Sequence, residues 1–106
     1  TPQLSFGRWS CACLDADGVL FPLLHKSSSW SAYRNPKTDK LLEDARQTLD
    51  LNKRLDSYRA VNAIVAQDIP LVPLYQAASL YGTAKGLQWQ PTPDESMFIN
   101  RMTFKE

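Results

Sequence analysis

The sequence predicts an α/β fold, in which two packed helices lie against a small mixed sheet. Two neighbouring stretches between residues 35 and 68 place apolar residues at helical spacing. Shorter stretches with alternating apolar and polar residues precede and follow them. Pro70 separates the second helix from the last strands, because proline cannot continue a helix.

Length and charge restrict the architecture and the partners. With 106 residues, the chain has the size of a single domain, 1–106. Hydrophobic residues make up 43% of it and charged residues 22%, which is typical of a folded chain. The net charge of +1 gives no electrostatic reason to expect binding to nucleic acid or to an anionic membrane.

The first predicted elements are a strand, a loop and a short helix. Leu4 and Phe6 alternate with polar or small residues and predict a strand that begins at Pro2. Residues 10–18 are small, polar and acidic, which is typical of a loop. We expect Asp17 to cap a short helix over 19–24, whose length Pro22 limits.

Two longer helices follow, over 35–49 and 50–68. Asn35 and Asp50 are favoured N-caps, and Pro36 suits a first helical turn because its missing N–H needs no partner there. The predicted buried face of the first helix consists of Leu41, Leu42, Ala45 and Leu49. That of the second consists of Leu55, Tyr58, Val61, Ile64 and Val65.

The remaining residues predict strands. They cover 71–81, where Pro73 indicates an edge or a bend, then 87–91, and finally 97–104. With the strand before the helices, these segments would supply the mixed sheet.

Cys11, Cys13 and His25 are the candidate catalytic or metal-binding residues of the chain. A disulfide between cysteines two residues apart would be strained, and a structural zinc site needs more well-spaced ligands than the sequence offers. We therefore predict partly buried cysteines in a loop, a helix-end histidine, no catalytic residue, no metal and no cofactor. The alternative is a small thiol- or metal-dependent enzyme that uses Cys11, Cys13 and His25. Asp15 and Asp17 are expected to cap a helix or to order a turn.

Five motifs follow one another in a fixed order between residues 9 and 75. They are Trp-Ser-Cys-Ala followed by Asp-Ala-Asp in 9–17, Tyr-Arg-Asn-Pro-Lys-Thr-Asp-Lys-Leu-Leu in 33–42, Ala-Arg in 45–46, Asp, Lys-Arg and Tyr in 50–58, and Ile-Pro-Leu-Val-Pro-Leu-Tyr in 69–75. Together they resemble the C-terminal part of the family 5 extracellular solute-binding proteins, the oligopeptide-, dipeptide- and nickel-type binding components of ABC importers.

The resemblance implies a fold and a function. Family members have two lobes, of the periplasmic-binding-protein type II, and residues 1–106 would be a C-terminal fragment, mostly of the second lobe with the tail returning toward the first. It also implies a non-enzymatic transport protein that is periplasmic or extracytoplasmic, captures a peptide or related small solute by lobe closure, and delivers it to a membrane permease. A fragment of this kind is expected to bind its solute poorly alone and to self-associate.

The resemblance also selects a binding segment, residues 9–13. In peptide-binding relatives this loop faces the cleft, and an aspartate three residues after the tryptophan holds the terminal ammonium of the peptide. Here that position is Ala12, and Ala16 replaces the proline of the family's Asp-Pro. The predicted ligand-binding residues are Trp9 as an apolar wall, with Cys11, Ala12 and Cys13 supplying backbone groups and small side chains. The cargo stays unidentified.

Overall fold

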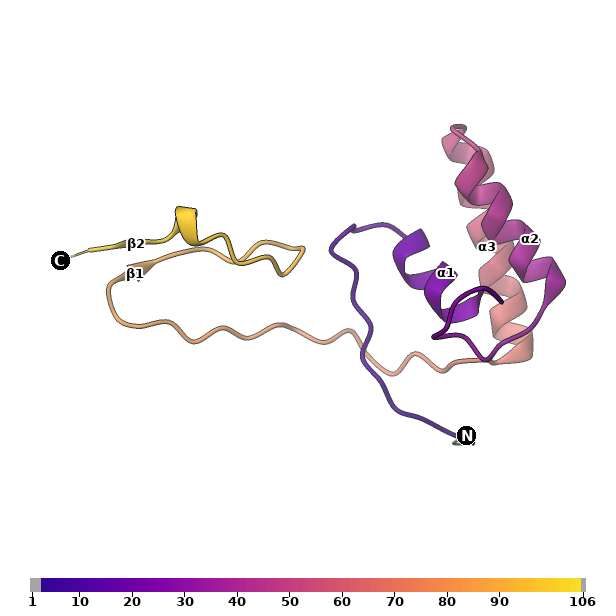
Figure 1. Cartoon of the computed structure of the whole chain (residues 1–106), viewed down its shortest axis with the longest axis horizontal. Helices are drawn as coiled ribbons and strands as arrows, with labels where there is room; N and C mark the ends of the chain where they lie inside the picture. The colour runs from indigo at the N-terminus through magenta and orange to yellow at the C-terminus, as the bar shows by residue number, and fades with distance from the viewer. Residues whose placement is uncertain (1–2, 106) are drawn as a thin grey trace.

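The computed structural model describes residues 3–105. Its elements are α1 (Asp17–Leu24), α2 (Pro36–Gln47), α3 (Leu51–Asp68), β1 (Leu87–Gln88), the 3₁₀ helix η1 (Ile99–Arg101) and β2 (Thr103–Phe104). The three helices form one body, and an extended arm leaves α3 and carries both strands away from it (Figure 1). The molecule is elongated as a result, with principal extents of 59 × 38 × 21 Å.

The predicted mixed sheet against the helices is wrong, although helices and strands are both present. The sheet has two antiparallel strands, with Leu87 opposite Phe104 and Gln88 opposite Thr103. Within residues 3–105, α2 packs on α3 and α1 on α2, whereas the strands contact only each other.

The strands predicted over 87–91 and 97–104 are confirmed only in part, by β1 and β2, and the other two do not form. Residues 5–10 and 71–84 are extended but make no ladder, and η1 interrupts the strand expected over 97–104. Alternating side chains make a segment suited to a sheet, but a strand exists only where a second backbone pairs with it. Pro2, the predicted start of the first strand, lies outside the described residues.

Local capping explains where α2 and α3 begin, and here the prediction is confirmed. The Asn35 side chain accepts hydrogen bonds from two N–H groups of the first turn of α2. The Asp50 side chain does the same for α3. α2 ends at Gln47, two residues earlier than expected, because Thr48 is already extended. Leu49 therefore lies in the connection, fully exposed, and not on the predicted buried face.

α1 begins at Asp17, so the prediction that Asp17 caps it is wrong. The N-cap position is Ala16, whose side chain makes no capping hydrogen bond. One residue earlier, Asp15 Oδ1 accepts a hydrogen bond from the Asp17 N–H at 2.8 Å. Pro22 lies inside the helix, which ends at Leu24 as predicted.

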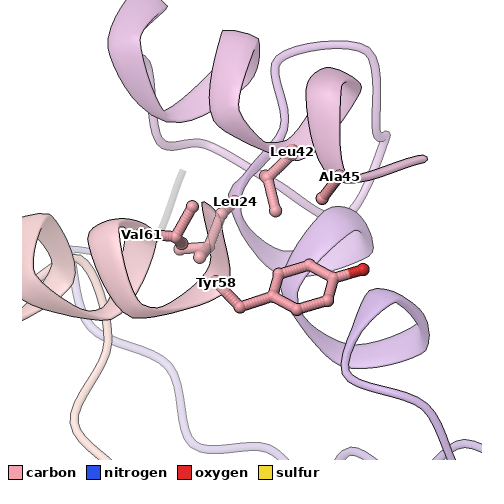
Figure 2. Close-up of a cluster of buried hydrophobic side chains, with 5 residues drawn as sticks. All are labelled: Leu24, Leu42, Ala45, Tyr58 and Val61. Carbon is pink, nitrogen blue, oxygen red and sulfur yellow. The ribbon is translucent and has the colours of Figure 1, made fainter. Parts of the chain in front are cut away.

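A small core joins the three helices. Its buried members are Leu24 of α1, Leu42 and Ala45 of α2, and Tyr58 and Val61 of α3 (Figure 2). Leu55, which was expected on the same face of α3, is 42% exposed. The core holds α1 against the α2–α3 pair and thereby fixes the end of the loop that precedes α1.

None of the helices in residues 3–105 has the length and apolar character that crossing a membrane requires.

Candidate functional site

The candidate site is the loop of residues 9–18, called the Trp9 loop below. Cys11 and Cys13 form a disulfide in it, contrary to the prediction. The chain turns sharply here: the Leu14 N–H donates to the Cys11 carbonyl at 3.2 Å, and Leu14 has a φ of 52°. The turn brings the two cysteine Cα atoms to 5.2 Å, which lies within the usual range for disulfides. The prediction assumed a more extended backbone.

Gly18 lies directly against the disulfide. It is the second residue of α1, and a Cβ built on it would overlap the sulfur atoms of both cysteines. Only glycine therefore lets the disulfide lie this close to the first turn of the helix.

Trp9 is hydrogen-bonded to Gly18 as well. Its indole N–H donates to the Gly18 carbonyl at 2.9 Å. In a regular α-helix this carbonyl would accept from the N–H of residue 22, but Pro22 has none. The half-buried Trp9 ring also makes an edge-to-face contact with Trp30, with 5.7 Å between ring centroids.

Two arginines hold the acidic end of the loop. Arg54 donates two hydrogen bonds to the Asp15 carboxylate, at 2.7 and 2.9 Å. Arg46 donates two to Asp17, at 2.7 and 2.8 Å, and stacks over the Phe21 ring. The Arg54 hydrogen bonds, followed by that from the Asp17 N–H, hold the pKa of Asp15 below its usual value. The loop is thus tied to both long helices.

Sequence patterns did not predict these ion pairs. Asp15 and Asp17 were expected to cap or to order a turn, and Asp15 accepts a hydrogen bond from the Asp17 N–H just before α1. Their arginine partners lie 39 and 29 residues further along the chain. No spacing rule links groups so far apart.

The start of the loop contacts the extended arm. Arg8 forms an ion pair with Glu95 at 2.5 Å, and the hydroxyl groups of Ser79 and Ser10 donate to the same carboxylate. The Ser79 hydrogen bond, followed by the positive charge of Arg8, lowers the pKa of Glu95. The arm is therefore anchored beside the Trp9 loop at an exposed polar cluster.

His25 does not join the cysteines. It is buried at the end of α1, as predicted for a helix-end histidine, and stacks on Phe21 with ring centroids 4.1 Å apart. Its ring nitrogens lie 2.8 Å from the Ser27 hydroxyl and 3.1 Å from a Glu43 carboxylate oxygen.

The alternative of a thiol or metal enzyme required free cysteines near His25. Both cysteines are in the disulfide, and no three metal-binding side chains of the described chain form a cluster. The structure therefore does not assemble the site that this alternative needs.

The predicted ligand-binding residues lie together in the Trp9 loop, and the hollow between the long helices is lined by other residues. A shallow hollow of about 390 Å³ opens where α2 meets α3. Its lining consists of Asp17, Ala45, Arg46, Thr48, Leu49, Leu51 and Arg54. Both of its arginines are already paired with carboxylates of the loop. Ala12 and Cys13 are exposed elsewhere on the surface.

The sequence is similar to that of a periplasmic-binding protein of an ABC transporter. This relative is the probable ABC transporter periplasmic-binding protein SapA of Escherichia coli (strain K12), with 28% identity over 97 residues. The match covers 84% of this chain and 18% of SapA, so the chain spans less than a fifth of the length of the relative. No family model matches the chain, and no solved structure does.

Proposed function

We propose that this chain is the C-terminal part of an extracytoplasmic solute-binding protein that serves an ABC importer. It contributes to the capture of a peptide or related small solute between two lobes, and to its delivery to a membrane permease, without bond chemistry. The observation that carries the proposal is the similarity to SapA over 97 residues. The order of motifs from Trp9 to Tyr75 supports it.

Residues 9–13 form the solute contact in this proposal. The indole N–H of Trp9 already donates to the Gly18 carbonyl. The rest of the indole ring is apolar and would form the apolar wall. Cys11, Ala12 and Cys13 make a tight, disulfide-closed turn, of which Ala12 and Cys13 are exposed. Such a turn presents backbone groups to a solute at a low entropic cost, because it is already ordered.

The test is isothermal titration of the longer protein that contains this chain, with peptides of defined length. Saturable binding is expected, and Trp9→Ala should weaken it at least tenfold by removing the apolar wall. Trp89→Ala is the matched control, since Trp89 packs on Tyr81 of the arm and not in the Trp9 loop, and should leave the affinity unchanged. Equal affinities of the Trp9→Ala variant and the unmodified protein would contradict the role of the loop. The 106-residue chain alone should show no saturable binding.

Ala12 gives a second test, of cargo chemistry. Since no carboxylate stands at this position, we expect the solute to be held without a clamp on a free ammonium group. Ala12→Asp should therefore raise the affinity for peptides with a free N-terminus and not for their N-acetylated forms. An equal effect on both forms would show that position 12 does not face the peptide terminus.

A further inference from the structure

The Cys11–Cys13 disulfide of the Trp9 loop can undergo thiol–disulfide exchange, a reaction that solute binding does not require. Cys13 is exposed and Cys11 is half-buried. A disulfide at the surface is accessible to an external thiolate, and exchange depends on such access and on the stability of the departing thiolate.

The two sulfur atoms have different surroundings. The Cys13 N–H donates to the Cys11 sulfur at 3.2 Å, and this bond would strengthen if Cys11 carried a negative charge. The Cys13 sulfur lies 3.8 Å from the carbonyl oxygen of Asp15, an acceptor that favours a protonated thiol. The carboxylates of Asp15 and Asp17 are compensated by their arginines and oppose a thiolate less than free carboxylates would. Cys11 is thus the better leaving group and Cys13 the better point of attack.

We propose that Cys11–Cys13 is a reversible thiol–disulfide exchange site for external dithiols, and that its redox state sets the position of Trp9 on α1. A thiolate of the dithiol attacks the Cys13 sulfur, the bond between the cysteines breaks, and its electron pair leaves with Cys11 as a thiolate. The second thiol of the reagent, as a thiolate, then attacks the reagent's own sulfur in the mixed disulfide. Cys13 departs with the electron pair, and both cysteine thiolates can take up protons. The dithiol is oxidised by two electrons and the cysteine pair is reduced.

Gly18 couples this chemistry to the position of the loop. Both sulfurs lie against its Cα, and its carbonyl accepts the Trp9 hydrogen bond. Two unbonded sulfur atoms need more space than a bonded pair, and densely packed groups transmit such a change in volume. Because the helix lies behind the sulfurs, the space comes from movement of the loop away from α1, which loosens the Trp9 contact.

The first experiment titrates the folded 106-residue chain in mixtures of reduced and oxidised dithiothreitol, with alkylation and mass spectrometry to count thiols. Two thiols should appear together and disappear again on reoxidation, while circular dichroism shows that most of the helix content is retained. If thiols appear only when the helices unfold, the exchange site is refuted. Brief exposure of the oxidised chain to reduced glutathione should place the mixed disulfide on Cys13. Its location on Cys11 would refute the assigned direction of attack.

The second experiment tests the coupling. Gly18→Ala adds a Cβ that overlaps the compact disulfide, so it should shift the dithiothreitol midpoint toward reduction by roughly tenfold. Gly7→Ala, at a glycine with nothing within 4 Å, should leave the midpoint unchanged. Equal midpoints of the two variants would overturn the coupling.

A spectroscopic readout covers the case in which Gly18→Ala does not fold. In a Trp30→Phe, Trp89→Phe background, Trp9 is the remaining tryptophan of the three, and its emission should move to longer wavelength on reduction. The same background with Cys11→Ser and Cys13→Ser should not respond to dithiothreitol. An emission wavelength that is identical in both redox states would refute the loop movement. None of these measurements includes a solute, so their failure and the failure of solute binding are separate results.

Discussion

Arg54 connects the Trp9 loop to the core. Its guanidinium holds the Asp15 carboxylate and lies 5.2 Å from the ring centroid of the buried Tyr58. Burial, the first cause, raises the pKa of the Tyr58 hydroxyl, so this side chain stays neutral beside the ion pair at physiological pH. Arg54 therefore holds the Asp15 carboxylate of the Trp9 loop next to the buried core of the three helices.

Replacement of Arg54 should be visible in the titration of Asp15. In the folded chain the pKa of Asp15 is lowered, first by the Arg54 hydrogen bonds. The pair therefore stabilises the fold above the usual aspartate pKa of about 3.9. This stabilisation is lost as the pH falls through the lowered pKa of the folded state. In Arg54→Met, the pKa of Asp15 should rise, yet remain below the usual value because the Asp17 N–H still donates to it.

Carboxyl-detected NMR titration measures this change. Arg59→Met is the matched control, since Arg59 pairs with Asp56 on the exposed side of the same helix, and it should leave the Asp15 titration as it was. An Asp15 curve that is identical in Arg54→Met and in the unmodified chain would contradict the role of the pair.

At the scale of elements, the helices were predicted more fully than the strands, of which only short parts of 87–91 and 97–104 form. The boundaries at Asn35 and Asp50 follow from hydrogen bonds to residues two and three positions further on, so short-range patterns determine them. A strand depends on a distant partner: 14 residues separate β1 (Leu87–Gln88) from β2 (Thr103–Phe104). The disulfide was not predicted for a different reason: it depends on a local turn with a positive φ at Leu14, which the sequence pattern does not indicate.

The packing of α2 gives a prediction at this scale. Leu42 is completely buried among the three helices, whereas Leu49 just beyond the helix is fully exposed. Leu42→Ala should lower the free energy of unfolding by about 3 kcal/mol. Leu49→Ala should change it by less than about 0.5 kcal/mol. Urea denaturation followed by circular dichroism measures both, and equal losses would mean that the core is not where α1, α2 and α3 meet.

The whole molecule has more exposed apolar surface than its small core can cover. Exposed large side chains along the arm and the start of the chain include Leu4, Phe6, Val72, Leu74, Tyr75, Leu80 and Phe104. Much of the same backbone is extended without a ladder partner, and unpaired extended backbone favours association between chains.

We therefore expect the isolated 106-residue chain to self-associate. Light scattering should show a mass above that of one chain at high concentration, and a clean monomer would contradict this. Leu74→Lys with Leu80→Lys should reduce the association by placing charges on the extended arm. Leu51→Lys, at an exposed leucine at the start of α3, serves as the control and should not reduce it if the arm is the contact.

The missing N–H of Pro22 has a consequence for the order of folding. A helix normally completes its own hydrogen bonds as it forms, but in α1 the Gly18 carbonyl has no donor at residue 22 and receives one from Trp9. The first turn of this helix is thus fully satisfied only once a side chain nine residues upstream has arrived. Docking of Trp9 and completion of α1 are one cooperative event, so whatever displaces Trp9 also weakens the start of the helix.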